Sequence, residues 1–201
     1  MAATRECQIH LTFDDGPHPV NTPKLLDELR QAGVSATFFV LGKNLEKPRG
    51  KELVERAAAE GHQIGNHSYS HPHLTELSGA RIREEILKTE ELIGGADKGV
   101  KVFRPPYGHR NSLVDRVARE LGYSLVSWTV DSLDWDPKHQ HSWVQHAAEL
   151  IVTQDRSIVL AHDVHATTVE NVGSLIANIR KLCHSSFVSC SDVLPRSVSL
   201  I

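Results

Sequence analysis

Strand-like and helix-like segments alternate along the chain almost from end to end. The strand candidates are residues 9–13, 36–41, 63–66, 100–103, 123–130, 157–161 and 187–190. The helix candidates are residues 23–32, 51–60, 80–93, 112–121, 142–153 and 169–183. Every strand candidate except the last is followed by a helix candidate, and this alternation predicts a parallel sheet with helices outside it.

Two of these helices have clear end signals. Thr22 precedes Pro23 at the start of the first helix and Gly33 follows its end, which makes Thr22 the predicted N-cap. Asn111 is the predicted N-cap of the helix that Gly122 closes. These signals indicate where the chain turns back toward the next strand.

Chain length limits how the predicted sheet can be arranged. Alternating strands and helices form either an open doubly wound sheet or a closed barrel. A full eight-unit barrel typically takes about 250 residues, so a barrel built from 201 residues must be short or incomplete. The sequence has no linker or low-complexity tract, and we therefore expect residues 1–201 to form a single domain.

Composition narrows the classes of function. Hydrophobic residues make up 40% of the chain and charged residues 23%, as in a globular protein. The formal net charge is −3 and no block of Lys and Arg occurs, so we expect no nucleic-acid partner. No apolar run approaches the ~20 residues of a membrane span, and residues 1–8 lack the apolar core of a signal peptide. We therefore expect a chain that stays inside the cell, or a mature or trimmed form.

The three cysteines, Cys7, Cys183 and Cys190, form no recognisable framework. An odd number without a CxxC pair is a poor basis for disulfides or for a zinc–thiolate site. Cys183 and Cys190 are near enough in sequence to pair, but buried or idle thiols are the simpler interpretation. The 13 histidines are more informative, because several stand beside carboxylates.

Polar residues gather just after the predicted strands. In parallel α/β folds, ligands bind beyond the carboxyl ends of the strands. The residues at these ends are Asp14 and Asp15, then His67 and His71, then residues 104–108, then Asp131, Asp134 and Trp135, and finally His162 and Asp163. Separate loops that converge on one face predict a functional site there.

The paired aspartates and the paired histidines each allow two interpretations. Asp14 and Asp15 precede a Gly-Pro pair, which is ordinary turn chemistry. Two carboxylates at one strand end can also divide metal binding and proton transfer between them. His67 and His71 are four residues apart, a spacing that occurs by chance but also suits two ligands of one Zn²⁺. With Asp15 they would complete a His₂–carboxylate set that leaves positions open for water and substrate.

The remaining charged residues are interpreted from their neighbours. Arg104 is either a solvated loop cation or the partner that keeps Asp14 ionised and oriented. His162 is either a histidine at the edge of the core or a general acid. In the second case Asp131 or Asp134 would raise its pKa by charge pairing.

Aromatic residues near these loops also have two interpretations. Tyr107 and Trp135 present flat, amphipathic surfaces on which a sugar ring can stack, although ordinary packing also accounts for them. For Trp128 and Trp143 we favour ordinary packing.

Together these segments resemble the polysaccharide deacetylases of carbohydrate esterase family 4, the NodB-homology group. Five motifs occur in the family's order between residues 12 and 162. They are Thr12-Phe13-Asp14-Asp15-Gly16-Pro17, His67-Ser68-Tyr69-Ser70-His71, Arg104-Pro105-Pro106-Tyr107, Asp131-Ser132-Leu133-Asp134-Trp135 and Leu160-Ala161-His162. Residues 187–194 resemble the family's last strand. Each motif is weak alone, whereas the ordered set is specific.

The resemblance implies an α/β fold with a distorted (β/α)₇ barrel and a role for each motif residue. The implied catalytic residues are Asp14 as general base, His162 as general acid, Arg104 as the partner of Asp14, and Asp131 as the residue that tunes His162. The implied ligands of a divalent metal, Zn²⁺ or alternatively Co²⁺, are Asp15, His67 and His71. The implied walls of the acetyl pocket are Tyr107, Trp135 and Leu160.

The implied function is metal-dependent removal of N-acetyl groups from polymers or oligomers that contain GlcNAc, such as chitin, chitooligosaccharides or peptidoglycan. An O-deacetylase of acetylated xylan is the nearest alternative, because the same attack by water cleaves esters. A hydrolase of small amides and a non-catalytic sugar-binding module are further alternatives, the latter disfavoured because base and acid are both present. We expect a monomer that binds an N-acetylated glycan, and the family is usually secreted or associated with the cell wall.

Overall fold

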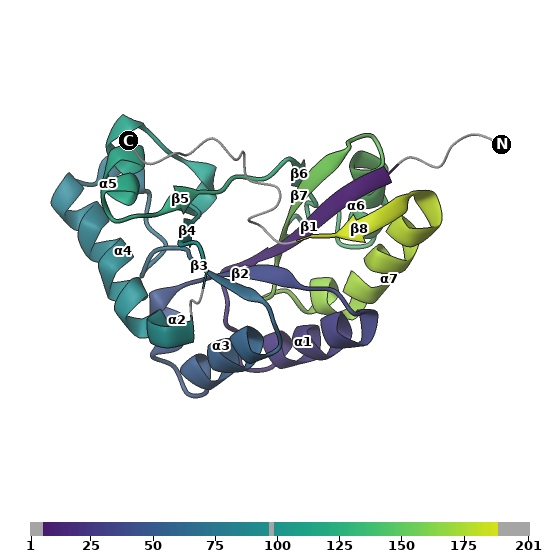
Figure 1. Cartoon of the computed structure of the whole chain (residues 1–201), viewed down its shortest axis with the longest axis horizontal. Coiled ribbons are helices and arrows are strands. Elements are labelled where there is room, and N and C mark those ends of the chain that lie inside the picture. Colours follow the sequence, from purple (N-terminus) through teal and green to yellow (C-terminus); the bar gives the residue numbers. More distant parts are fainter. Residues whose placement is uncertain (1–5, 97–98, 189–201) are drawn as a thin grey trace.

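The computed structural model describes residues 6–96 and 99–188 of the chain. Within these ranges a parallel sheet is surrounded by α-helices (Figure 1). The strands are β1 (Glu6–Asp14), β2 (Ala36–Val40), β3 (Gln63–Asn66), β4 (Val102–Phe103), β5 (Ser124–Leu125), β6 (Val130–Asp131), β7 (Arg156–His162) and β8 (His184–Phe187). The helices are α1 (Asn21–Ala32), α2 (Gly42–Leu45), α3 (Gly50–Ala59), α4 (Gly79–Ile93), α5 (Ser112–Glu120), α6 (Trp143–Ile151) and α7 (Ala166–Leu182).

The sheet is built outward from β1. Seven strands follow the order β5-β4-β3-β2-β1-β7-β6, and all their pairings are parallel. β1 pairs with β7 over residues 8–14, with β2 over residues 11–14 and with the additional strand β8 over residues 6–9. Within the described ranges no ladder joins β5 to β6, so the barrel is open on that side. The predicted α/β fold with a distorted (β/α)₇ barrel is therefore confirmed.

The main hydrophobic core lies between this sheet and the helices beside it. Ile9, Leu11 and Phe13 of β1 are at most 2% exposed, which explains why this central parallel strand has a nearly continuous apolar sequence. Helices α1 and α7 pack side by side against it (Figure 1). A second hydrophobic cluster lies between α4 and α5 and includes Ile86 of α4 and Val114 of α5. Among the described residues, no helix has the length and apolar composition needed to cross a membrane.

The predicted caps of α5 and of the end of α1 are confirmed. The Asn111 side chain accepts hydrogen bonds from the backbone N–H groups of Leu113 and Val114, at 3.1 and 3.0 Å. Gly33 follows α1 with a φ of 63°, a left-handed conformation that glycine adopts at no steric cost. Both signals act locally, which is why the sequence alone reveals them.

Thr22 is not the N-cap of α1, so that prediction was wrong. The helix begins two residues earlier than predicted, at Asn21, and the Nδ1 atom of His18 accepts hydrogen bonds from the backbone N–H groups of Val20 and Asn21 at 3.3 and 3.1 Å. The imidazole thus satisfies N–H groups that the helix leaves unpaired. The Thr22 hydroxyl instead accepts from the His18 N–H at 2.7 Å and donates to the carboxylate of Asp163.

The predicted strand at residues 123–130 is divided between β5 and β6, which lie at opposite edges of the sheet. Residues 126–129 cross the open side of the barrel. The backbone N–H of Val126 donates to Phe103 O in β4, and that of Thr129 donates to Ile158 O in β7, both at 2.9 Å. One continuous strand cannot form because its two ends pair with different neighbours.

The last strand also differs from its predicted position. β8 ends at Phe187, where the predicted strand 187–190 begins. The expectations for residues 187–194 and for a Cys183–Cys190 pair involve residues outside the described ranges. Cys7, in β1, is a buried free thiol.

Asn111→Ala should lower the free energy of unfolding by about 1 kcal/mol, because two backbone N–H groups at the start of α5 lose their acceptor. Urea denaturation of the two proteins measures the difference. Asn111→Asp is the matched control, since Asp caps helices about as well as Asn. Equal destabilisation by Asp and Ala would contradict a capping role.

Candidate active site

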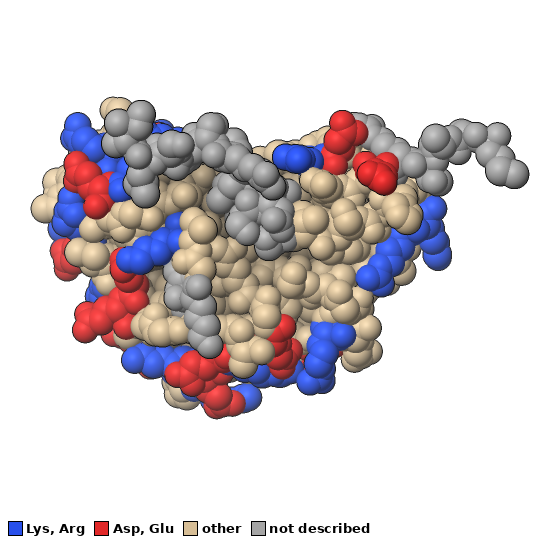
Figure 2. Space-filling model, viewed as in Figure 1, with Lys and Arg blue, Asp and Glu red and all other residues tan. Residues whose placement is uncertain are grey.

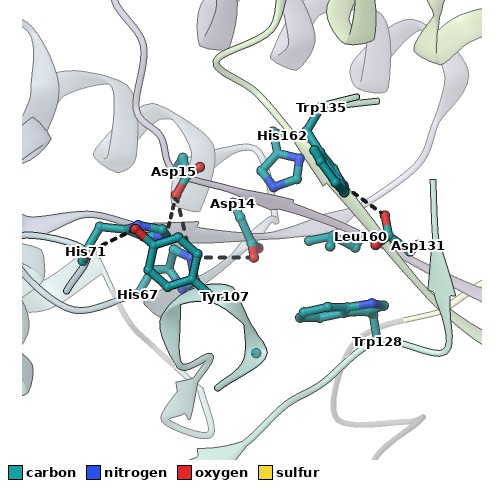
Figure 3. Close-up of a pocket in the computed structure, with 11 residues that line it drawn as sticks. Asp14, Asp15, His67, His71, Tyr107, Trp128, Asp131, Trp135, Leu160 and His162 are labelled. Carbon is teal, nitrogen blue, oxygen red and sulfur yellow. Dashed lines mark hydrogen bonds and ion pairs between the residues drawn. The ribbon is translucent and has the colours of Figure 1, made fainter. Parts of the chain in front are cut away.

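The predicted site residues come together at the carboxyl ends of the strands, around a pocket of about 420 Å³ (Figure 3). Its lining residues are Asp14, Asp15, His67, His71, Tyr107, Gly108, Trp128, Asp131, Trp135, Leu160 and His162. Of the predicted site residues, only Arg104 is outside this lining, because it is fully buried behind Asp14. The convergence of separate loops on one face is therefore present in the structure.

Asp15, His67 and His71 form a compact group of donor atoms. The Oδ1 atom of Asp15 lies 3.6 Å from His67 Nε2 and 3.3 Å from His71 Nε2. The Nδ1 atom of His67 is 2.6 Å from the carbonyl oxygen of Arg104, which assigns its proton to Nδ1 and leaves a lone pair on Nε2. Burial lowers the pKa of His67 to about 3 and also lowers that of His71, so both imidazoles are neutral at neutral pH.

This group of three residues fits a divalent cation. Asp15 Oδ1 is buried and accepts no hydrogen bond within the described part of the chain, although a buried carboxylate oxygen normally has a partner. Two imidazoles with lone pairs beside one unpartnered carboxylate oxygen match the ligand types of catalytic zinc sites. Asp15 and His71 could therefore hold a metal together with His67.

The metal-binding group depends on uncommon backbone conformations. Asp15, Ser68 and His71 have φ values of 73°, 71° and 65°. Left-handed conformations at non-glycine residues are sparsely populated, although Asp and His tolerate them better than most. The two loops therefore need contacts elsewhere to hold this geometry.

Asp14 is held by a buried ion pair. Arg104 Nη1 lies 2.7 Å from Asp14 Oδ1 and also donates to the Thr12 hydroxyl at 2.7 Å. The other oxygen, Oδ2, is 3.7 Å from His67 Nε2 and so borders the metal-binding group. Burial raises the pKa of Asp14 despite the opposing charge of Arg104, so Asp14 is a stronger base than a solvated carboxylate. The predicted ion pair between Arg104 and Asp14 is present, but burial affects the pKa of Asp14 more than the charge of Arg104 does.

The partner of His162 is Asp134 and not Asp131, which corrects the role that the family resemblance implied. His162 Nδ1 lies 2.8 Å from Asp134 Oδ1, and the His162 backbone N–H donates to Asp134 Oδ2 at 2.8 Å. Thr168 also donates to Asp134 Oδ2, at 2.6 Å. Burial lowers the pKa of His162, but the hydrogen bond and charge of Asp134 outweigh it and raise the value to about 9. His162 therefore carries a proton at neutral pH.

Asp131 orients an indole ring instead. Its Oδ1 atom accepts from the backbone N–H of Leu133 at 3.0 Å and from Trp135 Nε1 at 3.3 Å (Figure 3). The reason for the difference is local: Asp131 is the last residue of β6, whereas Asp134 lies in the turn that follows β6 and reaches His162 at the end of β7. Both alternatives were open from the sequence, and spacing alone did not separate them.

Aromatic side chains form much of the pocket wall. Tyr107 and Trp135 are each 50% exposed, and the buried Leu160 also lines the pocket. Trp128, for which we predicted ordinary packing, also lines the pocket, opposite Trp135 (Figure 3). Trp143 is 1% exposed, as expected of a core residue.

Trp128 was missed because its segment was predicted to be a strand. It lies in the crossing segment, residues 126–129, whose course depends on the open side of the barrel. Its indole packs so closely on Gly108 that a Cβ atom there would lie 2.7 Å from the ring. Gly108, directly after the Tyr107 motif, was the one available signal.

Comparison with known proteins agrees with this geometry. A family model described as polysaccharide deacetylase matches residues 2–126. The chain is 38% identical over 174 residues to a peptidoglycan-N-acetylglucosamine deacetylase of Listeria monocytogenes. The aligned region covers 86% of this chain and 36% of that protein. The chain is 33% identical over 190 residues to a chitooligosaccharide deacetylase of Rhizobium leguminosarum, over 93% of this chain and 80% of that protein. The chain thus spans well under half the length of the Listeria relative.

A solved structure shares the fold. The family 4 carbohydrate esterase from Streptomyces lividans, determined in complex with acetate, superposes with a TM-score of 0.80 at 35% identity. The match covers 91% of this chain and 93% of that chain.

Asp134→Asn should lower the pKa of His162 by about 1–3 units, because the ring loses the adjacent negative charge while remaining buried. Asp14 and Asp15 still face the ring, and His165 lies 5.6 Å from it. NMR titration of the imidazole nitrogens in metal-free protein measures the shift. Asp131→Asn is the control and should leave the value nearly unchanged; equal shifts in the two variants would contradict the assignment of Asp134.

Proposed function

The chain belongs to the polysaccharide deacetylase family, and we propose that it is a metal-dependent hydrolase that removes N-acetyl groups from glycans containing GlcNAc. The observation that carries this proposal is the arrangement of a buried base, a protonated acid and a metal-binding group around one pocket. Asp14 and the metal-binding group lie together, and His162 lies beside them (Figure 3). A metal-dependent amide hydrolase uses these three elements within reach of one acetyl group.

Asp15, His67 and His71 would hold the metal, and we propose Zn²⁺, with Co²⁺ as a substitute that accepts the same ligands. When bound, such an ion polarises the acetyl carbonyl and lowers the pKa of water toward ~7. Asp15 Oδ1, which accepts no hydrogen bond within the described ranges, would then have a partner.

Asp14 would accept the proton of the attacking water. Its Oδ1 atom is held by Arg104, which leaves Oδ2 free on the side of the metal-binding group. A general base works best when its pKa approaches the working pH, and burial moves the pKa of Asp14 in that direction. Arg104 therefore orients the base without removing its basicity.

His162 would donate a proton to the departing nitrogen. Because Asp134 holds Nδ1, the proton that can reach a substrate is on Nε2. An amine leaves poorly unless it is protonated, so this step completes C–N cleavage. With a pKa of about 9, the ring keeps its proton at neutral pH and loses it as the pH rises through that value, and activity should fall there too.

The pocket wall suits a sugar bearing an acetyl group. The exposed rings of Tyr107 and Trp135, together with Trp128, offer apolar faces of the kind on which pyranose rings stack. The names of the relatives point to peptidoglycan and chitooligosaccharides as substrates. We therefore propose an N-acetylglucosamine polymer or oligomer, acted on by a monomer.

Acetate release across chitooligosaccharides, chitin, peptidoglycan and acetylated xylan tests the proposed function. We expect turnover on at least one of the N-acetylated glycans, and a strict preference for xylan would contradict N-deacetylation. Asp14→Asn is the matched control. It should lower kcat by about 10²–10⁴-fold because the base is lost, and its metal content should equal that of the wild type. Full activity in this variant would exclude Asp14 as the base.

Removal of metal by a chelator should abolish activity, and added Zn²⁺ or Co²⁺ should restore it. His67→Ala should remain inactive at the metal concentrations that restore the wild type, since it lacks one of three ligands. Metal content measured alongside acetate release connects the two effects. Unchanged turnover after complete demetallation would exclude a metal-dependent mechanism.

A further inference from the structure

Glu85 of α4 contacts the loop that carries His67 and His71, although it is outside the pocket. Its Oε2 atom accepts the backbone N–H groups of Tyr69 and Ser70 at 2.9 and 2.8 Å. Its Oε1 atom accepts the Ser70 hydroxyl at 2.8 Å. One carboxylate thus receives three hydrogen bonds from two consecutive residues that lie between the histidines.

The carboxylate of Glu85 is buried and its charge is directed at this loop. Glu85 is 9% exposed, and within the described ranges its carboxylate has no cationic partner. Charged residues are rarely buried this far unless something compensates them. Here the compensation comes from amide and hydroxyl donors of the loop, and such charge-assisted bonds are about twice as strong as neutral ones.

The N-terminus of α2 donates to the Ser68 and Tyr69 carbonyls of this loop, whereas the acceptor for the N–H groups of Tyr69 and Ser70 is Glu85. Ser68 and His71 have φ values of 71° and 65°, which end β3 abruptly and turn the N–H groups of Tyr69 and Ser70 toward α4. Without Glu85 those two N–H groups would lose their acceptor in a partly buried place, which disfavours the observed loop conformation.

We propose that Glu85 is a positioning residue that sets the affinity and geometry of the metal site by holding the His67–His71 loop. The inference rests on the proposed metal-dependent function. Glu85 is not among the residues that line the pocket, and its carboxylate acts through the backbone and the Ser70 hydroxyl between the two ligands. Residues that orient metal ligands from outside typically change metal affinity or activity by about 10–100-fold when they are replaced.

Glu85→Leu should therefore weaken Zn²⁺ binding by about 10–100-fold, measured by competition with a chromophoric chelator. Glu85→Gln should lose less, because its carbonyl can accept both N–H groups and its amide can donate to Ser70. The visible absorption spectrum of the Co²⁺ form should change in Glu85→Leu and resemble the wild type in Glu85→Gln. This rescue pattern separates positioning from a loss of stability alone.

Glu84→Leu is the matched control, since Glu84 is the neighbouring residue of α4, is exposed and pairs with Arg81 on the surface. It should bind Zn²⁺ like the wild type. Ser70→Ala provides a milder variant if Glu85→Leu does not fold. It removes the hydroxyl contact alone and should weaken binding by roughly 3–10-fold.

The outcomes distinguish this inference from the proposed function. If the wild type binds Zn²⁺ tightly and Glu85→Leu and Ser70→Ala bind it equally well, the positioning role is wrong and the metal site stands. If the wild type binds no Zn²⁺, or if His67→Ala binds it unchanged, the metal site itself fails and the role of Glu85 fails with it.

Discussion

The parallel ladder between β1 and β7 brings the proposed base and acid together. Residues 8–14 of β1 pair in register with residues 156–162 of β7, and the last pair of this ladder is Asp14 with His162. The same strand pairs with β2 on its other side, which leads through β3 to the loop of His67 and His71. The hydrogen bonds between these strands therefore set the distances between the side chains of the site.

Burial gives these side chains properties that they would lack in water. His67 is kept neutral, whereas His162 is kept protonated by a carboxylate at its Nδ1 atom. The pKa of Asp14 rises although a guanidinium contacts it. Two imidazoles in one pocket thus hold different protonation states at neutral pH, because each has a different balance of desolvation and charge pairing. The separate roles proposed for Asp14 and His162 depend on these local differences.

Much of the fold and most of the site could be predicted from the sequence. The alternation of segments predicted the parallel sheet, and local signals such as Asn111 and Gly33 predicted helix ends correctly. Nine of the ten predicted site residues line one pocket with the tenth, Arg104, directly behind it. These successes concern contacts that are local in sequence or common to every parallel α/β fold.

The failures concern contacts between segments that are distant in sequence. The Thr22 hydroxyl donates to Asp163, which is 141 positions further along the chain. Of Asp131 and Asp134, it is Asp134 that hydrogen-bonds to His162, which is 28 positions further along the chain. Trp128 lines the pocket because residues 126–129 cross the open side of the barrel. The sequence of that segment does not indicate that the barrel is open there.

The open side of the barrel gives Arg104 a second significance. Its guanidinium donates to Thr12 and Asp14 at the end of β1, and also to the carbonyl oxygens of Val126 and Ser127 in the crossing segment. One planar cation thus replaces the interstrand hydrogen bonds that a closed barrel would have there. Arg104 thus both pairs with the proposed base and fastens the segment bearing Trp128, so a substitution at this position should change the orientation of Asp14 and the shape of the pocket together.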